Sequence, residues 1–216
     1  MITFNQVTKR YTGGFEALSQ INFRMEKNEM VFLTGHSGAG KSTLLKLLAI
    51  LESPSSGEII VNGQPLNMLK KNQIAYYRSQ LGITFQTPHL LNHASVFENV
   101  AMPLLIKGES LSVVTKRVHA ALDMVNLLNK QKMLPIHLSC GEQQRVDIAR
   151  AMVHKPSILL ADEPTGNLDP ELSSEIMSVF SQLNQVGVTI LIATHDLPLI
   201  ASMRHRMITL KGGRIC

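Results

Sequence analysis

A glycine-rich segment, GHSGAGKS, fits the phosphate-loop pattern G-x-x-x-x-G-K-[ST] at every fixed position. Its glycines let the backbone curl so that successive N–H groups point at phosphate oxygens, and the helix expected behind it adds a favourable potential. We expect Lys41 to bridge the β- and γ-phosphates, Ser42 to bind Mg²⁺ through its hydroxyl and Thr43 to bond the α-phosphate. His36 should fill a variable position rather than act as an acid or base. The predicted phosphate site consists of Gly35, His36, Ser37, Gly38, Ala39, Gly40, Lys41, Ser42 and Thr43.

Two adjacent carboxylates, Asp162 and Glu163, follow the apolar run SILLA and should therefore lie at the end of a buried strand. Phosphoryl transfer to water needs a metal ion to neutralise charge between the β- and γ-oxygens, and a group that orients or deprotonates the nucleophile. We expect Asp162 to hold Mg²⁺ through water and Glu163 to face the attacking water. The pair predicts hydrolysis of a nucleoside triphosphate.

Two further polar residues follow apolar segments. His195 comes after TILIAT, where a histidine can bond the γ-phosphate and the water together, provided that it shares a sheet edge with Asp162. Gln86 closes GITFQ, where its amide can touch Mg²⁺ and report its position to the segment that follows. We therefore expect the catalytic group to consist of Glu163, His195 and Gln86, and the metal ligands to be Ser42, Gln86 and Asp162.

Three short apolar runs predict the strands that position these residues: Met30 to Gly35, Ser157 to Glu163 and Thr189 to Asp196. Each run ends in glycine or polar residues and then meets a helical pattern, which is the alternation of an α/β sheet. Ligands of such sheets bind at the carboxyl ends of the strands. The phosphate loop, the carboxylates and the histidine all follow such ends.

Two other parts of the chain have different patterns. Residues 1–30 and the segment Gly57 to Gly63 alternate apolar and polar residues, which predicts a small antiparallel β-layer. From Thr87 to His137 strand signals fade, and Val113 to Leu128 spaces apolar residues as an amphipathic helix does. We expect one domain over 1–216, with the core and β-layer in 1–86 and 138–216 and an inserted helical subdomain in 87–137.

Composition excludes several classes of protein. The 216 residues are 44% apolar and 17% charged, a globular balance rather than that of a disordered chain. Two cysteines, Cys140 and Cys216, supply neither a disulfide framework nor a four-ligand zinc site. No run reaches about 18 apolar residues and the N-terminus alternates like a strand, so we expect no membrane span, no signal peptide and a cytosolic chain. The 21 basic against 16 acidic residues suit an anionic partner: nucleotide phosphates, acidic lipid or nucleic acid.

The segment HLSCGEQQRVDIARAM, from His137 to Met152, resembles the LSGGQ signature of the ATP-binding cassette (ABC) ATPases. With the phosphate loop, Gln86, DEPTGNLD and His195 in the usual order, the resemblance covers essentially the whole chain. Within the family, the chain most resembles the cell-division branch. The segments that carry this closer resemblance are FLTGHSGAGKSTLLKLL, SCGEQQR, LLADEPTGNLD and GVTILIATHD. The resemblance implies an ATPase that uses ATP and Mg²⁺, with an α/β fold: a mostly parallel core sheet, an antiparallel β-layer and an inserted helical subdomain.

In that family Ser139, Gly141 and the helix start that includes Glu142 cap the γ-phosphate bound to the other subunit, so the resemblance implies a homodimer formed on ATP binding. A Ser-x-Gly turn that opens a helix is also an anion site with no phosphate in its own chain. Tyr11 matches the aromatic residue that stacks on adenine. Two residues depart from the pattern, since Cys140 replaces the first glycine and Glu142 the glutamine. If position 140 requires a positive φ, its side chain is strained and the cap is weakened.

The resemblance also implies an integral membrane partner whose cytoplasmic helices dock between Gln86 and the helical insertion. The chain would then lie at the cytoplasmic face of the inner membrane, peripheral through that partner, and ATP cycling would control cell-wall hydrolases. The ATPase of a lipoprotein-release or macrolide exporter has the same catalytic residues and remains an alternative. A soluble cassette that acts on nucleic acid or ribosomes is less favoured, because the chain has one phosphate loop and 5% aromatic residues. We expect no direct contact with nucleic acid.

Overall fold

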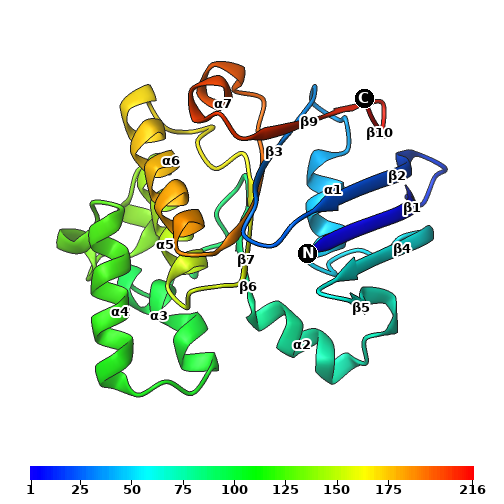
Figure 1. Cartoon of the computed structure of the whole chain (residues 1–216). Coiled ribbons are helices and arrows are strands. Elements are labelled where there is room, and N and C mark those ends of the chain that lie inside the picture. Colours follow the sequence, from blue (N-terminus) through cyan, green and yellow to red (C-terminus); the bar gives the residue numbers. More distant parts are fainter.

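Short apolar runs form the centre of a six-stranded sheet in the computed structural model, which describes residues 1–216 (Figure 1). The strand order is β10-β9-β3-β8-β7-β6, and every neighbouring pair is parallel except β9 and β10. This confirms the expected α/β fold with a mostly parallel core sheet. The strands are β3 (Met30–Thr34), β6 (Leu81–Thr84), β7 (Ile158–Asp162), β8 (Thr189–Ala193), β9 (Arg206–Lys211) and β10 (Arg214–Ile215).

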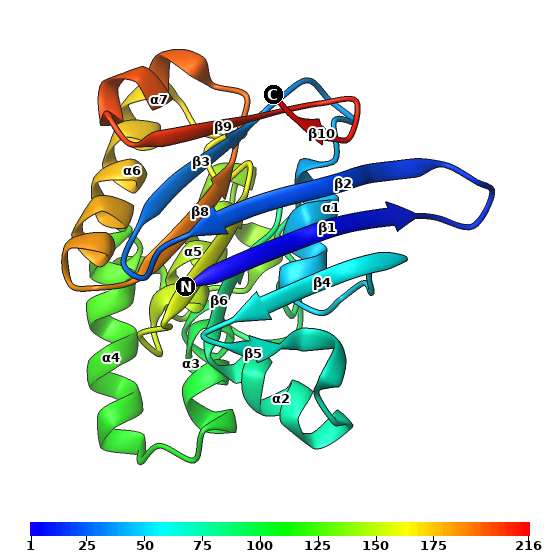
Figure 2. The same cartoon turned by 45° about the vertical axis from the view of Figure 1, so that its right-hand side comes forward.

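A second sheet is antiparallel, in the order β2-β1-β4-β5. Its strands are β1 (Ile2–Arg10), β2 (Glu16–Met25), β4 (Ser56–Val61) and β5 (Gln64–Pro65). The antiparallel layer expected from the alternation is therefore confirmed. Helix α1 (Lys41–Leu48) contacts strands of both sheets and lies behind the β-layer in Figure 2.

The remaining helices surround the two sheets. Helices α3 and α4 pack on each other and on α5, and the three lie at one end of the molecule (Figure 1). None of the helices combines the length and the apolar character that a membrane span needs. The α-helices are α2 (Lys71–Ser79), α3 (Val96–Ile106), α4 (Leu111–Met124), α5 (Cys140–Met152), α6 (Pro170–Gln185) and α7 (Leu197–Met203), with short 3-10 turns at Leu66–Met68, Leu128–Lys130 and Pro135–His137.

Helix α4 ends at Met124, whereas the apolar spacing predicts a helix that continues to Leu128. Asn126 has a φ of 55°, in the left-handed region that commonly stops a helix. Because Val125 and Leu127 are buried beyond this stop, their spacing imitates a helical face without being helical. The hydrophobic period alone does not reveal the stop.

Side chains that alternate along the central strands enter two separate apolar clusters. Met30 and Phe32 of β3 pack with residues of α3 to α6, whereas Val31 and Leu33 pack with α1 and the β-layer. Strands β7 and β8 divide their side chains in the same way. The core sheet therefore separates a helical side from a β-layer side.

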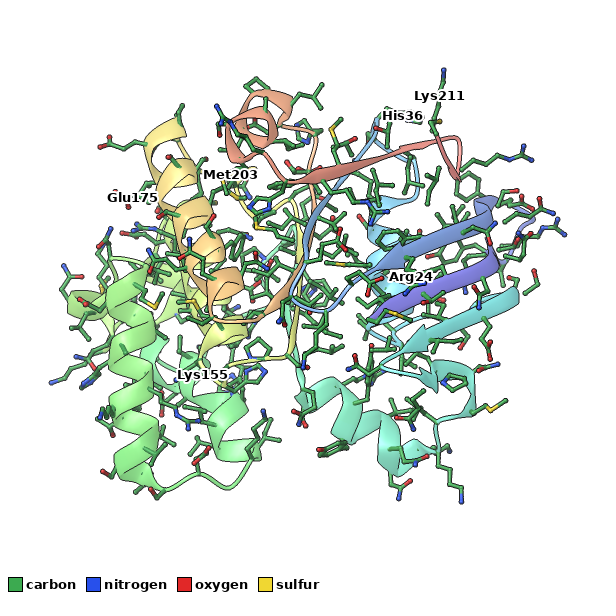
Figure 3. The ribbon with its side chains drawn as sticks, viewed as in Figure 1. Arg24, His36, Lys155, Glu175, Met203 and Lys211 are labelled. Atoms are coloured by element: carbon green, nitrogen blue, oxygen red, sulfur yellow. The ribbon has the colours of Figure 1, made fainter.

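Because β3, β6, β7 and β8 are parallel, their carboxyl ends meet at one edge of the sheet. The phosphate loop follows β3, Gln86 follows β6, Glu163 follows β7 and His195 follows β8. Figure 3 shows His36 at this edge, beside Lys211 of β9. The pairing of Thr34 with Thr209 brings these two segments together.

Candidate active site

The loop between β3 and α1 requires glycine at two positions. Gly35 has a φ of 145°, and a Cβ atom there would lie 2.3 Å from the carbonyl oxygen of Leu210. Gly40, the N-cap of α1, has a φ of 106°, and its Cβ would lie 2.6 Å from the carbonyl oxygen of Ala17. Glycine at both places lets the loop approach the backbones of β9 and β2 closely. The N-terminus of α1 is thereby presented to the edge, where its dipole favours an anion.

The Lys41 ammonium is held among oxygen atoms. Its Nζ donates to the carbonyl oxygens of Gly35 at 2.8 Å and His36 at 3.4 Å, and lies 3.7 Å from Oε1 of Glu163. The side chain is 9% exposed. Phosphate oxygens can replace the two carbonyl oxygens with little movement of the ammonium, which suits Lys41 to bind the β- and γ-phosphates.

Glu163 connects the ends of β7 and β8. Its N–H donates to the carbonyl oxygen of Ala193 at 2.8 Å, and its Oε2 lies 2.9 Å from Nδ1 of His195. The backbone of Glu163 has a φ of 49°, a left-handed conformation that costs a non-glycine residue about 1–3 kcal/mol. Strain of this kind persists where the surrounding structure holds a side chain in a working position.

Asp162 precedes this strained residue, and its Oδ1 atom is buried without a hydrogen-bond partner. Burial raises the pKa of Asp162 above its ordinary value, although a hydrogen bond with Ser42 opposes the rise. A carboxylate oxygen without a partner beside a serine hydroxyl is the kind of oxygen pair that Mg²⁺ prefers. The two residues therefore fit a Mg²⁺ site.

These residues line one cleft of about 450 Å³. It brings together most of the residues that the sequence predicts for the phosphate, metal and catalytic roles. Phe15 and Ala17 also line the cleft and were not predicted. The predicted residues in its wall are His36, Ser37, Gly38, Ala39, Gly40, Lys41, Ser42, Thr43, Gln86, Asp162, Glu163 and His195.

Tyr11 lies outside the wall of this cleft, although its hydroxyl is 3.4 Å from Oγ1 of Thr43. The Lys9 ammonium lies 5.0 Å from the centre of the Tyr11 ring. Phe15 is 61% exposed at the end of the same turn and faces the cleft. A large aromatic residue directly after two glycines was the signal that could have identified it.

The signature turn lies elsewhere, since Ser139, Gly141 and Glu142 do not line the cleft of their own chain. Ser139 is the N-cap of α5, and its Oγ accepts the N–H of Glu142 at 3.2 Å. Gly141 packs closely against Leu168, because a Cβ there would lie 3.1 Å from Cδ2 of Leu168 and the leucine side chain would have to shift.

The backbone strain that a positive φ would cause at Cys140 is not present. Cys140 is the exposed first residue of α5 and is absent from the residues with positive φ. The first turn of a helix has a backbone conformation that every L-residue adopts easily. The cysteine therefore fits the signature turn without backbone strain.

Three polar residues on one face of α5 hold the segment that follows β6. Gln144 donates to the carbonyl oxygen of Phe85 at 3.3 Å, and Arg150 donates to that of His89 at 2.7 Å. Arg150 also pairs with Asp147, whose side chain is fully buried. Gln86 lies inside the segment that they hold. Sequence reasoning missed this group, because polar residues three apart on a helix usually indicate a solvated face.

Comparison with known proteins identifies the family of the chain. Residues 18–166 match the sequence profile of the ABC transporter family. The chain is 54% identical over 215 residues to the cell division ATP-binding protein FtsE of Escherichia coli (strain K12), covering 100% of this chain and 97% of that protein. It is 42% identical over 215 residues to FtsE of Bacillus subtilis (strain 168), covering 100% and 94%.

Two solved structures are also similar. The dimeric structure of MJ0796, a bacterial ABC transporter cassette, superimposes with a TM-score of 0.95 at 36% identity, covering 100% of this chain and 96% of that one. A dimeric post-hydrolysis state of the same cassette, bound to ADP and Pi, gives a TM-score of 0.94 at 35% identity, with the same coverage.

Proposed function

The chain belongs to the ABC transporter family, and from that premise we propose that it is the ATP-hydrolysing subunit of a membrane complex that acts in cell division. It is an ABC-type ATPase. The observation that carries the proposal is the division of the predicted residues into two groups. Most of the residues predicted for phosphate, metal and hydrolysis line one cleft, whereas the signature residues are not part of its wall.

ATP binds in this cleft, with Lys41 and Thr43 on its phosphates. Ser42, Asp162 and Gln86 would hold Mg²⁺, and the free Oδ1 atom of Asp162 supports this assignment. The metal ion neutralises charge between the β- and γ-phosphate oxygens when it is bound. An aromatic ring near the cleft would stack on the adenine of ATP. The family resemblance favours Tyr11 for this role, whereas exposure at the cleft favours Phe15.

Hydrolysis proceeds by attack of water on the γ-phosphorus and departure of ADP. Glu163 orients the water and accepts its proton on a carboxylate oxygen. His195 lies 2.9 Å from that carboxylate and contacts the γ-phosphate from the end of β8. Lys41 leaves the carbonyl oxygen of Gly35 for the β- and γ-oxygens, where its charge stabilises the transition state.

The second half of each site comes from another copy of the chain. Ser139, Gly141 and Glu142 form a partly exposed helix N-terminus that lies outside the cleft of its own chain. In a closed dimer this turn caps the γ-phosphate of the opposite copy. The dimeric structure of the MJ0796 cassette supports the formation of a dimer.

A groove of about 340 Å³ supports a membrane partner. It lies between α2, β6, α3 and α5, and its wall includes Ile83, Pro103 and Ile106. Gln86, beside which the resemblance implies docking, is not part of this wall. Ile106 is 72% exposed. A cytoplasmic helix of an integral membrane protein resembling FtsX would bury this apolar surface and hold the chain peripherally at the cytoplasmic face of the inner membrane. ATP cycling would then move the partner and control cell-wall hydrolases.

One variant tests the ATP-dependent dimer. Glu163→Gln should bind Mg-ATP, lose hydrolysis and accumulate as a dimer in light-scattering chromatography, because it removes the base and leaves the metal ligands in place. Hydrolysis at the parent rate in a phosphate-release assay would refute the role of Glu163.

A second experiment tests the partner. The chain should copurify in detergent with the FtsX-like protein encoded by the same organism, and Ile106→Glu should abolish this association. Val186→Glu, at a residue 80% exposed on the far end of α6, is the matched control and should retain it. Copurification with the membrane subunit of a lipoprotein or macrolide exporter instead would support the alternative assignment.

A further inference from the structure

The carboxylate of Glu142 is bound at both oxygens. Oε2 accepts the N–H of Ser139 at 3.0 Å, which closes the capping box at the start of α5. Oε1 accepts a hydrogen bond from the ammonium of Lys130, which ends the 3-10 turn Leu128–Lys130. The hydrogen bond from Lys130 holds the pKa of Glu142 below its usual range, and the hydrogen bond from the N–H of Ser139 adds a smaller effect in the same direction. Glu142 is therefore a carboxylate at neutral pH.

A carboxylate at this place opposes the proposed role of the turn. The N-terminus of a helix attracts a phosphate because its N–H groups carry partial positive charge. A full negative charge in the first turn cancels that attraction and repels the γ-phosphate. Lys130 supplies the compensating positive charge from outside the helix, with a side chain that is 34% exposed.

The same contacts orient Ser139. Its Oγ accepts the N–H of Glu142 at 3.2 Å, so its hydroxyl hydrogen remains available to donate outward. Fixing the carboxylate with Lys130 keeps the capping box closed and this orientation in place. The ion pair therefore affects both the charge and the geometry of the turn.

We propose that Lys130 is a positioning residue for ATP bound to the second copy of the chain: it neutralises Glu142 and holds its carboxylate in the capping box, so that the signature turn can accept the γ-phosphate. This role rests on the proposed ATP-dependent dimer. It gives the segment between α4 and α5 a part in forming the composite site.

The test measures the dimer dissociation constant by sedimentation in excess Mg-ATP, in the Glu163→Gln background. Adding Lys130→Met should weaken the dimer about tenfold or more, because an uncompensated carboxylate then faces the phosphate. Adding Glu142→Gln to Lys130→Met should restore the constant to within about threefold, because the amide keeps an acceptor for Ser139 without a charge. ATP affinity of the monomer, measured with dilute protein, should not change in Lys130→Met, which lies outside the phosphate cleft.

Lys132→Met is the matched control. Lys132 lies two residues from Lys130, is exposed and makes no ion pair, so the substitution removes the same charge without breaking a contact. It should leave the dimer constant within about twofold. An equal loss in Lys132→Met, no loss in Lys130→Met, or failure of Glu142→Gln to restore the dimer would each overturn the role of Lys130. If Glu163→Gln alone formed no dimer, both the composite site and the role of Lys130 would be refuted. If it formed a dimer that Lys130→Met left unchanged, only the role of Lys130 would be refuted.

Discussion

The buried carboxylate of Asp147 accepts a hydrogen bond from the backbone N–H of Phe85, with 3.2 Å between Oδ2 and the nitrogen. Phe85 directly precedes Gln86, and Asp147 lies on the helix that begins at the signature turn. Burial raises the pKa of Asp147 above its ordinary value, while the nearby Arg150 opposes the rise. The buried carboxylate of Asp147, paired with the partly exposed Arg150, thus connects the segment that contains Gln86 to the helix of the signature turn.

Asp147→Asn should loosen this connection. The asparagine retains an acceptor for Phe85 but leaves the Arg150 guanidinium without a counter-charge, at a cost of about 3 kcal/mol in the free energy of unfolding. We expect a lower melting temperature and a several-fold higher Mg²⁺ concentration for half-maximal ATPase activity, because Gln86 is held less firmly. Asp123→Asn, at an exposed position of α4, is the control. Unchanged Mg²⁺ dependence in Asp147→Asn would contradict the connection to Gln86.

Lys41→Ala should abolish ATP binding, with an affinity loss of at least about 100-fold, because it removes the main point charge on the β- and γ-oxygens. Calorimetric titration with Mg-ATP measures the loss. Lys46→Ala removes an exposed lysine from the same helix and should bind ATP as the parent does. Undiminished affinity in Lys41→Ala would remove Lys41 from the phosphate site.

Cys140 is exposed at the start of α5, where a closed dimer would cover it. A thiol reagent should label it quickly in the nucleotide-free protein and block ATPase activity. Mg-ATP bound to the Glu163→Gln variant should protect it, whereas the exposed Cys216 should label equally in both states. Mass spectrometry after brief labelling measures both sites, and equal labelling of Cys140 with and without Mg-ATP would argue against its burial in the dimer.

His154, 8% exposed, makes stability depend on pH. Its Nε2 lies 3.1 Å from the carbonyl oxygen of Leu81. Burial, with a smaller effect of the charge of Lys107, lowers the pKa of His154 from 6.5 to about 4. The folded state therefore favours the neutral ring, and the stability that this gives is complete above the unfolded pKa and is lost as pH falls from 6.5 towards 4.

Between about pH 7 and pH 5, the free energy of unfolding should fall by roughly 1–2 kcal/mol through this group. Urea titrations at both pH values should show a smaller fall in His154→Gln, whose amide can still donate to Leu81. His93→Gln, at an exposed histidine, should retain the parent's pH dependence. The same fall in His154→Gln as in the parent would exclude His154 as its cause.

Much of the fold and of the cleft could be predicted because its signals are local. Each central strand is a short buried run, and Asp162 and His195 come at or just after the end of such a run, so the sequence predicts both at the carboxyl edge of the sheet. Strand β9 was not predicted, because MITLK is short and partly exposed, and its longer pairing is with β3, which is distant in the sequence, while its local partner β10 has only two residues. The burial of Asp147 and the pairing of Lys130 with Glu142 depend on tertiary contacts, which the type of residue alone does not reveal.

The alternation of side chains along β3, β7 and β8 also sets how slowly their amide hydrogens exchange with solvent. Because each strand lies between two apolar clusters, its amides exchange only when both clusters separate, which approaches global unfolding. Helix α2 has no buried residue, and the turn before Phe15 is exposed, so both should exchange through local opening. Asp162 and Glu163 therefore lie at the end of a strand that should exchange slowly, whereas Phe15, in the wall of the same cleft, lies beside a turn that should exchange quickly.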